Sequence, residues 1–221
     1  MSSTCDLVIY GAGGMGQEVA DLVGAAGADG APWRVVGFVD DDVELAGAEI
    51  VGLPVLGDHT WLEGRSVAVV VALGAPAARR RGRDLLRSLG VAELPALVHP
   101  AAYVGKDCDL GAGTVVAARA VLTVDVKVGD LAIVNIGATV SHNGRLGDFA
   151  TLAPAVHLAG NVRVGEGADL GIGCSVIQGH TVGQWSVVGA GAVVLDDVDP
   201  DTTVVGVPAR IVSKRRPGWQ E

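Results

Sequence analysis

An aliphatic residue recurs at every sixth position, without a break, through almost half of the chain. The sixteen positions are Val104, Leu110, Val116, Leu122, Val128, Val134, Val140, Leu146, Leu152, Leu158, Val164, Leu170, Val176, Val182, Val188 and Val194. The next residue is often glycine, and the fourth residue after each aliphatic one is often small. A repeat this short predicts a solenoid in which each hexad supplies a short strand, a turn and a pair of inward-facing residues.

Composition and charge agree with a folded repeat protein. The 221 residues include 33 glycines, and 49% are hydrophobic, which is enough apolar material for a buried core. The net charge of −9 argues against a nucleic-acid surface, because phosphate binding needs a basic stripe. A short basic run, Lys214-Arg215-Arg216, lies near the end of the chain. The three cysteines, Cys5, Cys108 and Cys174, form no CxxC pair, and their scatter favours a reducing compartment.

No apolar run approaches the length of a membrane span, and no secretory signal precedes the first apolar run. These patterns predict a cytoplasmic protein that does not insert into a membrane.

The first 100 residues lack the six-residue period and alternate between strand-like and helix-like segments. We expect strands at 7–10, 35–39, 67–71 and 94–98, and helices at 18–23 and 77–89. The change of period predicts two domains, residues 1–100 and 101–221.

Two motifs in the first domain indicate a nucleotide site. Gly11-Ala12-Gly13-Gly14-Met15-Gly16 lies between a predicted strand and a predicted helix, where backbone N–H groups can meet a phosphate. Asp40-Asp41-Asp42 ends the second strand, where such folds hold a ribose or base. About 100 residues provide one mononucleotide-binding half, which favours a nucleoside diphosphate over NAD. A tight turn without a ligand, and a solvated or metal-binding aspartate cluster, remain alternatives.

The hexads resemble the left-handed parallel β-helix of hexapeptide acyltransferases, in which three hexads form one triangular coil. Sixteen hexads then give about five coils. An α/β domain joined to such a β-helix by Val98-His99-Pro100-Ala101 resembles the nucleotide-amino-sugar N-acetyltransferases and the related sialic-acid O-acetyltransferases. Gly206-Val207-Pro208-Ala209-Arg210 resembles their closing segment. The resemblance implies an α/β N-terminal Rossmann-like half-domain followed by a left-handed parallel β-helix, with acetyl-CoA as co-substrate, a homotrimer and no metal.

The resemblance also implies two sets of binding residues. The nucleotide-linked sugar is expected at Gly11, Gly13, Gly14, Met15, Asp40, Asp41 and Gly74, although relatives often carry histidine in place of Met15. The acyl donor is expected between adjacent subunits, at Thr151, Gly160, Ile172 and Ala190. In that site the Gly160 N–H is a candidate donor to the thioester oxygen. Lys214, Arg215 and Arg216 could meet the CoA phosphates or form a solvated tail.

His142 is the candidate general base. It occupies a non-aliphatic position in Val140-Ser141-His142-Asn143-Gly144 and matches the catalytic histidine of the family, and a neutral imidazole can take a proton from an attacking amine. Asn143 stands where relatives usually place Glu or Asp, so it can orient the ring without adding charge. A surface histidine is the alternative.

The other histidines and cysteines suit catalysis less well. His99 is expected to be structural, His59 lies in a loop, His157 should face outward, and His180 falls on an inward position that could meet a neighbouring subunit. The histidine spacing does not resemble the zinc ligands of β-helical carbonic anhydrases. Cys174 also falls on an inward position and is expected in the core.

These observations predict an acetyl-CoA-dependent N-acetyltransferase acting by direct attack on a nucleotide-linked amino sugar, of the 4-amino-4,6-dideoxy type. The alternatives are a sugar O-acetyltransferase, a non-catalytic nucleotide-binding scaffold and a purely structural solenoid.

Overall fold

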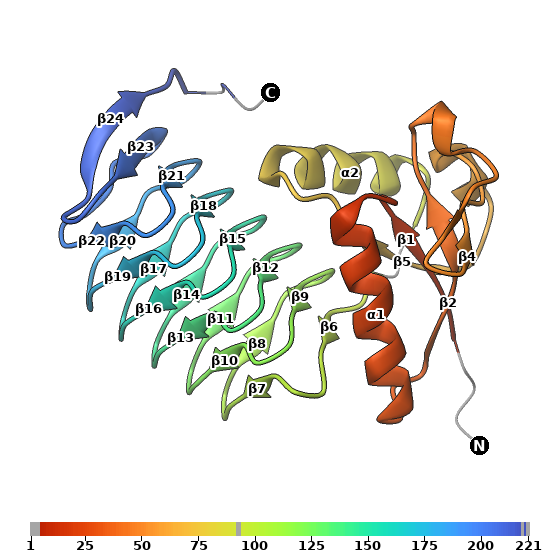
Figure 1. Cartoon of the computed structure of the whole chain (residues 1–221), viewed down its shortest axis with the longest axis horizontal. Helices are drawn as coiled ribbons and strands as arrows, with labels where there is room; N and C mark the ends of the chain where they lie inside the picture. Colours follow the sequence, from red (N-terminus) through yellow and green to blue (C-terminus); the bar gives the residue numbers. More distant parts are fainter. Residues whose placement is uncertain (1–4, 92–93, 218, 220–221) are drawn as a thin grey trace. The chain divides into compact units, whose positions relative to one another are not determined.

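A computed structural model describes residues 5–91, 94–217 and 219. The chain divides into two compact units, Met1–Pro100 and Ala101–Glu221, whose elements are labelled in Figure 1.

The first unit contains a three-stranded parallel sheet with strand order β2-β1-β5. Its regular elements are β1 (Cys5–Tyr10), α1 (Gly14–Ala28), β2 (Trp33–Val39), β5 (Ala68–Val71), α2 (Pro76–Ser88) and β6 (Leu97–Val98). The central strand β1 contributes fully buried Leu7, Val8 and Ile9, and such apolar runs are typical of parallel sheets covered on both faces. The strand expected at 94–98 is shorter than predicted, and residues 92–93 before it lie outside the described residues.

An insertion between β2 and β5 was not predicted. It contains η1 (Val43–Leu45), β3 (Glu49–Ile50), β4 (Leu53–Pro54) and η2 (His59–Leu62). Asp42 and Asp58 cap the two 3-10 helices by accepting the N–H groups of Glu44 and Thr60, at 3.1 and 2.9 Å. The insertion brings His59 back to the end of β2, which the sequence pattern alone does not indicate.

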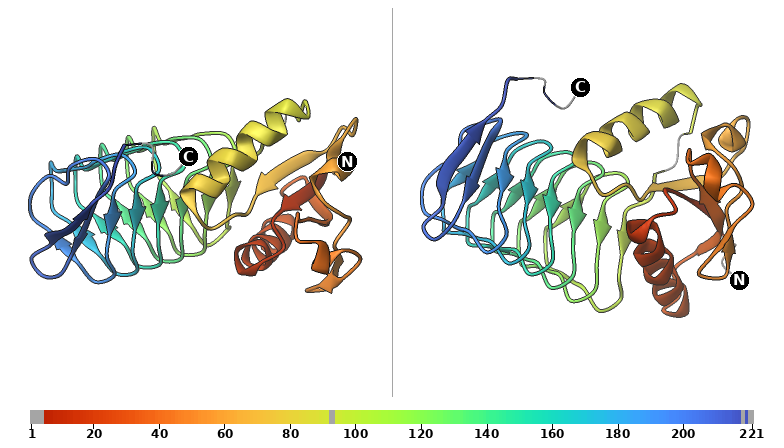
Figure 2. Two further views of the ribbon diagram at one scale, coloured as in Figure 1. Left: turned by 90° about the horizontal axis from the view of Figure 1, so that it is seen from above. Right: turned by 45° about the horizontal axis from the view of Figure 1, so that its top comes forward.

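The second unit is a parallel β-helix built from very short strands, whose coils are seen from two directions in Figure 2. The two-residue strands are β7 (Tyr103–Val104), β8 (Asp109–Leu110), β9 (Val115–Val116), β10 (Val121–Leu122), β11 (Lys127–Val128), β12 (Ile133–Val134), β13 (Thr139–Val140), β14 (Arg145–Leu146), β15 (Thr151–Leu152), β16 (His157–Leu158), β17 (Arg163–Val164), β18 (Asp169–Leu170), β19 (Ser175–Val176), β20 (Thr181–Val182), β21 (Val187–Val188) and β22 (Val193–Val194). The longer strands β23 (Thr202–Val205) and β24 (Arg210–Lys214) follow them.

Every third strand pairs in parallel, which gives three sheets. They contain β7-β10-β13-β16-β19-β22, β8-β11-β14-β17-β20, and β9-β12-β15-β18-β21-β23-β24, where only the last pair is antiparallel. The second residue of nearly every strand is the aliphatic residue of a hexad and is buried. The predicted fold class, with its α/β unit and left-handed β-helix, is confirmed.

The β-helix has about six coils, so the prediction of about five is too low. Val198 forms a parallel bridge with Val182, and β23 pairs with β21. Therefore β22, Val198 and β23 complete a sixth coil. The sequence period misses this coil because Val198 follows Val194 by four positions instead of six.

The glycines that follow the aliphatic residues are explained by the contact between coils. A Cβ atom on Gly147 would lie 2.6 Å from the Glu166 nitrogen, and one on Gly165 would lie 2.5 Å from the Gln184 nitrogen. Because coils stack at the interstrand spacing of about 4.8 Å, no side chain fits between these backbones.

One corner of the β-helix is filled by aromatic rings. Phe149 and Trp185 stack with ring centroids 6.4 Å apart, and both are buried. Gly167 lies one coil from each of them, and a Cβ atom there would collide with the Trp185 ring.

Substitution of Gly167 tests this packing. Gly167 and Gly173 have φ of +62° and +68°, but only Gly173 has open space around its Cα. Gly167→Ala should therefore lower the free energy of unfolding by about 1–3 kcal/mol more than Gly173→Ala does, because only the first variant overpacks. Urea unfolding followed by circular dichroism measures the difference. Equal losses in the two variants would contradict the packing account.

Candidate functional site

The glycine-rich turn joins β1 to α1, and its glycines have different roles. Gly11 has φ of +110°, and a Cβ atom there would lie 2.9 Å from the Ala72 oxygen; a Cβ atom on Gly16 would collide with Gly11. Packing therefore explains these two glycines. Gly13 and Gly14 instead border open space. Gly13 is the N-cap of α1 and provides no side-chain cap, so the first-turn N–H groups can take an external acceptor.

Asp40 ties the end of β2 to the glycine turn. Its carboxylate accepts the Ala12 N–H at 2.7 Å and the Asp42 N–H at 3.0 Å. This contact places the predicted aspartates beside the predicted glycines.

Asp41 is held by groups that the sequence analysis did not select. The Tyr10 hydroxyl donates to Asp41 at 2.6 Å, the His59 N–H donates at 3.1 Å, and His59 Nδ1 lies 2.7 Å from the same carboxylate. Partial burial opposes ionisation of Asp41, but hydrogen bonds from Tyr10 and His59 outweigh it and lower its pKa. Burial and the neighbouring Asp41 raise the pKa of Tyr10. Asp41 is thus a carboxylate acceptor at neutral pH, beside a neutral phenol.

Gly74 belongs to the loop that follows β5. Arg79 is only 1% exposed. Its guanidinium donates to the carbonyl oxygens of Leu73 and Gly74, at 3.0 and 2.5 Å. Since Leu73 also approaches Gly11, this loop lies against the glycine turn. Arg79 was not predicted, because a buried arginine cannot be told from a surface one by its position in an arginine-rich helix. Met15 is half-buried in the first turn of α1.

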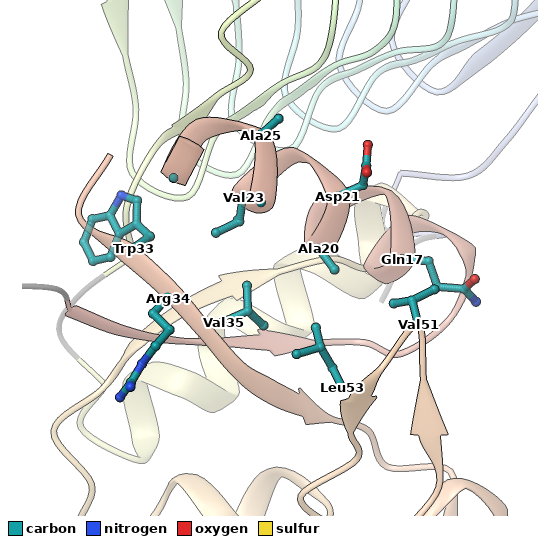
Figure 3. Close-up of a pocket in the computed structure, with 12 residues that line it drawn as sticks. Gln17, Ala20, Asp21, Val23, Ala25, Trp33, Arg34, Val35, Val51 and Leu53 are labelled. Carbon is teal, nitrogen blue, oxygen red and sulfur yellow. The ribbon is translucent and has the colours of Figure 1, made fainter. Parts of the chain in front are cut away.

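A separate hollow lies along α1 and the beginning of β2 (Figure 3). Its lining includes Val23, Trp33, Val35 and Leu53. No residue predicted to bind the substrate lines it.

In the β-helix, His142 and Gly160 lie together in one corner, on successive coils. Register pairs β13 with β16, and His142 and Gly160 each come two residues after their strand. A Cβ atom on Gly160 would collide with the imidazole, nearest to Nε2. The ring of His142 therefore lies directly over the Gly160 backbone, and a side chain at position 160 would displace the ring.

Asn143 lies beside the other ring nitrogen. Asn143 Nδ2 is 3.2 Å from His142 Nδ1, and it is also 3.2 Å from Asn161 Oδ1. The structure thus brings together three predicted residues, His142, Asn143 and Gly160, and adds Asn161 to them.

The remaining acyl-donor residues lie elsewhere on the same chain. Ile172, which is 60% exposed, and the exposed Ala190 occupy another corner on successive coils, where the Gly191 N–H donates to the Ile172 oxygen at 2.8 Å. Thr151 lies on β15 in the sheet before that corner. The strands β16 and β19 separate this corner from the one that holds His142. The four residues expected to bind the acyl donor, Thr151, Gly160, Ile172 and Ala190, therefore do not form a single cluster within one chain.

Three further polar residues have partners within the chain. His157 Nδ1 lies 2.9 Å from Thr139 Oγ1, and His180 Nδ1 lies 2.9 Å from Asp197. Lys214 pairs with Asp199 at 2.7 Å. His180, whose inward position suggested a neighbouring subunit, thus has an acidic partner in its own chain. In the described part of the chain, no group of three His, Cys, Asp or Glu side chains could hold a metal ion, and no helix could span a bilayer.

The fold is that of a hexapeptide acyltransferase carrying an α/β unit. Residues 6–83 match the family model of the PglD N-terminal domain. The chain is 36% identical to the acetyltransferase domain of PglB from Neisseria gonorrhoeae FA1090, with a TM-score of 0.86 over 94% of this chain and 99% of that chain. Comparison with curated protein sequences gave no match.

Two other solved structures are similarly close. A histidine-to-asparagine variant of perosamine N-acetyltransferase from Caulobacter crescentus, in complex with CoA and GDP-perosamine, is 37% identical over 95% of this chain and 97% of that chain, with a TM-score of 0.87. WeeI from Acinetobacter baumannii AYE is 30% identical over 95% of this chain and 100% of that chain, with a TM-score of 0.85. The chain belongs to the hexapeptide-repeat family of sugar N-acetyltransferases, which confirms the predicted family and enzyme class.

Cysteine reactivity can be predicted from burial. Cys174 is fully buried, and burial raises the pKa of its thiol to about 12. At pH 8 only about 10⁻⁴ of such a thiol is thiolate, which is the nucleophilic form. Iodoacetamide at pH 8 should therefore modify exposed Cys5 and leave Cys174 unmodified until urea unfolds the β-helix. Peptide mass mapping gives the readout. Alkylation of Cys174 in the folded protein at the rate of Cys5 would contradict the prediction.

Proposed function

We propose that the protein transfers the acetyl group of acetyl-CoA to the amino group of a nucleotide-linked amino sugar, of the 4-amino-4,6-dideoxy type. The observation that carries this proposal is the imidazole of His142 over the Gly160 backbone. It places a candidate base within reach of a candidate oxyanion donor. The relative from C. crescentus, solved with CoA and GDP-perosamine, and the PglB domain, solved with acetyl coenzyme A, support both substrate classes.

The proposed mechanism is direct attack. The sugar nitrogen attacks the thioester carbonyl carbon, and His142 Nε2 takes a proton from that nitrogen. The carbonyl oxygen becomes an oxyanion, to which the Gly160 N–H donates. The carbon–sulfur bond then breaks, and CoA leaves as thiolate. The Gly160 carbonyl oxygen accepts the Gly179 N–H at 3.0 Å, so pairing between coils holds the backbone that directly follows the donating N–H.

The first unit is proposed to bind the nucleotide, and the β-helix to carry the acyl transfer. Open space in front of Gly13 and Gly14 allows a diphosphate to meet the N–H groups at the start of α1. Asp40 and Asp41 lie beside this turn, where their carboxylates can accept donors from a ribose or base. With three parallel strands, the unit offers one mononucleotide-binding half, which favours a nucleoside diphosphate over NAD.

A homotrimer completes the proposal. Thr151, Ile172 and Ala190 of one chain would bind CoA against His142 and Gly160 of the next chain. The separation of these two groups by the strands of one sheet supports a donor site shared between subunits. We further propose that the reaction uses no metal ion and that the protein is cytoplasmic.

The role of His142 is tested by replacing it. His142→Ala should lower the turnover number with acetyl-CoA and a nucleotide-linked 4-amino sugar by about 10²–10⁴-fold, because general base catalysis contributes that much. His157→Ala is the matched control, since His157 is also an exposed β-helix histidine but lies on a strand. Release of the CoA thiol measures both rates. Near-wild-type turnover by His142→Ala would remove this residue from the mechanism.

The nucleotide site is tested by filling the open space at the glycine turn. Gly14→Val should weaken nucleoside diphosphate binding at least about 10-fold, because the side chain takes the place of the phosphate, a loss of about 1.4 kcal/mol or more. Gly24→Val is the control, because it makes the same change in the same helix at another glycine that borders open space. This variant should bind the nucleoside diphosphate as the wild type does. Calorimetry with GDP, UDP and dTDP measures the effect. Equal binding by both variants would place the nucleotide elsewhere.

A further inference from the structure

The imidazole of His59 is held against Asp41, just after the end of β2. Oδ1 of Asp41 lies 2.7 Å from His59 Nδ1 and accepts the backbone N–H of His59 at 3.1 Å. Oδ2 of Asp41 accepts the hydroxyl of Tyr10, a buried residue at the end of β1, at 2.6 Å. Tyr10 therefore fixes Asp41 relative to the sheet, and Asp41 fixes both the backbone and the ring of His59.

This contact leaves one ring nitrogen of His59 for a ligand. Hydrogen bonds lower the pKa of Asp41, and an ionised carboxylate can only accept, so Nδ1 is the nitrogen that donates. Among the residues that the structure describes, Nε2 of His59 has no hydrogen-bond partner, and the side chain is partly exposed. Nε2 offers a lone pair when the ring is neutral and an N–H when it is charged.

Asp41 itself has little capacity left for a ligand. An ionised carboxylate offers about four acceptor positions, and three of those on Asp41 are taken by His59 and Tyr10. The carboxylate of Asp40 accepts only two backbone N–H groups, one on each oxygen. Asp40 is thus better suited to accept from a ligand directly, and Asp41 is better suited to orient His59.

The location of His59 matches the part of a nucleotide that lies farthest from the phosphates. The diphosphate is proposed to lie at Gly13 and Gly14, and folds of this kind hold the ribose at the end of the second strand. Asp40 occupies that position, and its carboxylate is bonded to the glycine turn. Asp41 and then His59 follow in space. This order is the order of phosphate, ribose and base in a nucleotide.

We propose that His59 contacts the nucleobase through Nε2, and that Asp41, fixed by Tyr10, is the positioning residue that orients the ring. This inference rests on the proposed nucleotide site and adds His59 to it. The edge of a nucleobase carries hydrogen-bond donors and acceptors side by side. Nε2 therefore finds a partner on the base in either charge state of the imidazole.

Removing the imidazole should affect only the part of the affinity that depends on the base. Calorimetry compares the tightest-binding of GDP, UDP and dTDP with the same sugar 5-diphosphate lacking its base. His59→Ala should weaken binding of the nucleotide about 3–10-fold, the usual contribution of one hydrogen bond, and leave binding of the compound without a base unchanged. His180→Ala is the matched control, because His180 Nδ1 pairs with Asp197 in the same way, at 2.9 Å, but in the β-helix. This control should bind both compounds as the wild type does.

The positioning role of Asp41 is tested by combining it with His59. Asp41→Ala should lose base-dependent affinity to a similar extent as His59→Ala, because the ring is no longer held. The double variant should bind the nucleotide no more weakly than His59→Ala alone, since Asp41 acts through the ring that is already absent. An additive loss in the double variant would show that Asp41 contacts the base itself, and would overturn the positioning role. Circular dichroism checks that each variant folds, and His59→Ala tests the base contact independently of Asp41.

The same titrations separate this inference from the proposed site. A His59→Ala variant that weakens both compounds alike, or neither, would overturn the base contact. Gly14→Val should weaken both compounds, because each carries the diphosphate that is proposed to lie at the glycine turn. If Gly14→Val left both unchanged while His59→Ala still weakened the nucleotide alone, the proposed phosphate position would be refuted and the base contact would stand.

Discussion

Hydrogen bonding between successive coils is the interaction on which the rest of the β-helix depends. It brings residues that are 18 positions apart into register, as with Thr139 and His157 or Arg145 and Arg163. The same register stacks the aliphatic residues into the core and excludes side chains at glycines such as Gly147 and Gly165. Because the strands of successive coils pair in parallel throughout, a polar residue at a corner lies between the hydrogen-bonded backbones of the coil before it and the coil after it.

The candidate active site depends on this register between coils. His142 and Gly160 occupy the same corner position on successive coils, as do Asn143 and Asn161. The base, the backbone donor and the asparagine pair therefore belong to two consecutive turns of one rigid scaffold. Rigid elements hold such groups more accurately than long loops do. A neutral Asn143 gives the imidazole less basicity than a carboxylate would, and an amine acceptor suits this better than a hydroxyl, which gives up its proton less readily.

The sequence predicted the β-helix well because its period is a direct consequence of packing. It failed at the sixth coil, where two residues are missing between Val194 and Val198 and the period slips. It identified His142, Asn143 and Gly160 from motifs, and the 18-residue spacing of a three-hexad coil could also have indicated Asn161. Tyr10, His59 and Arg79 could not be found in this way, because their positions depend on the insertion after β2 and on burial of a helix face.

Acetyl transfer to nitrogen is the central claim, and the product tests it most directly. The wild-type protein should be incubated with acetyl-CoA and a nucleotide-linked 4-amino sugar, and the product examined by mass spectrometry before and after mild base. We predict a sugar carrying one added acetyl group that survives the base, as an amide does. An acetyl group removed by the base would identify an ester and a hydroxyl acceptor, and would contradict the account.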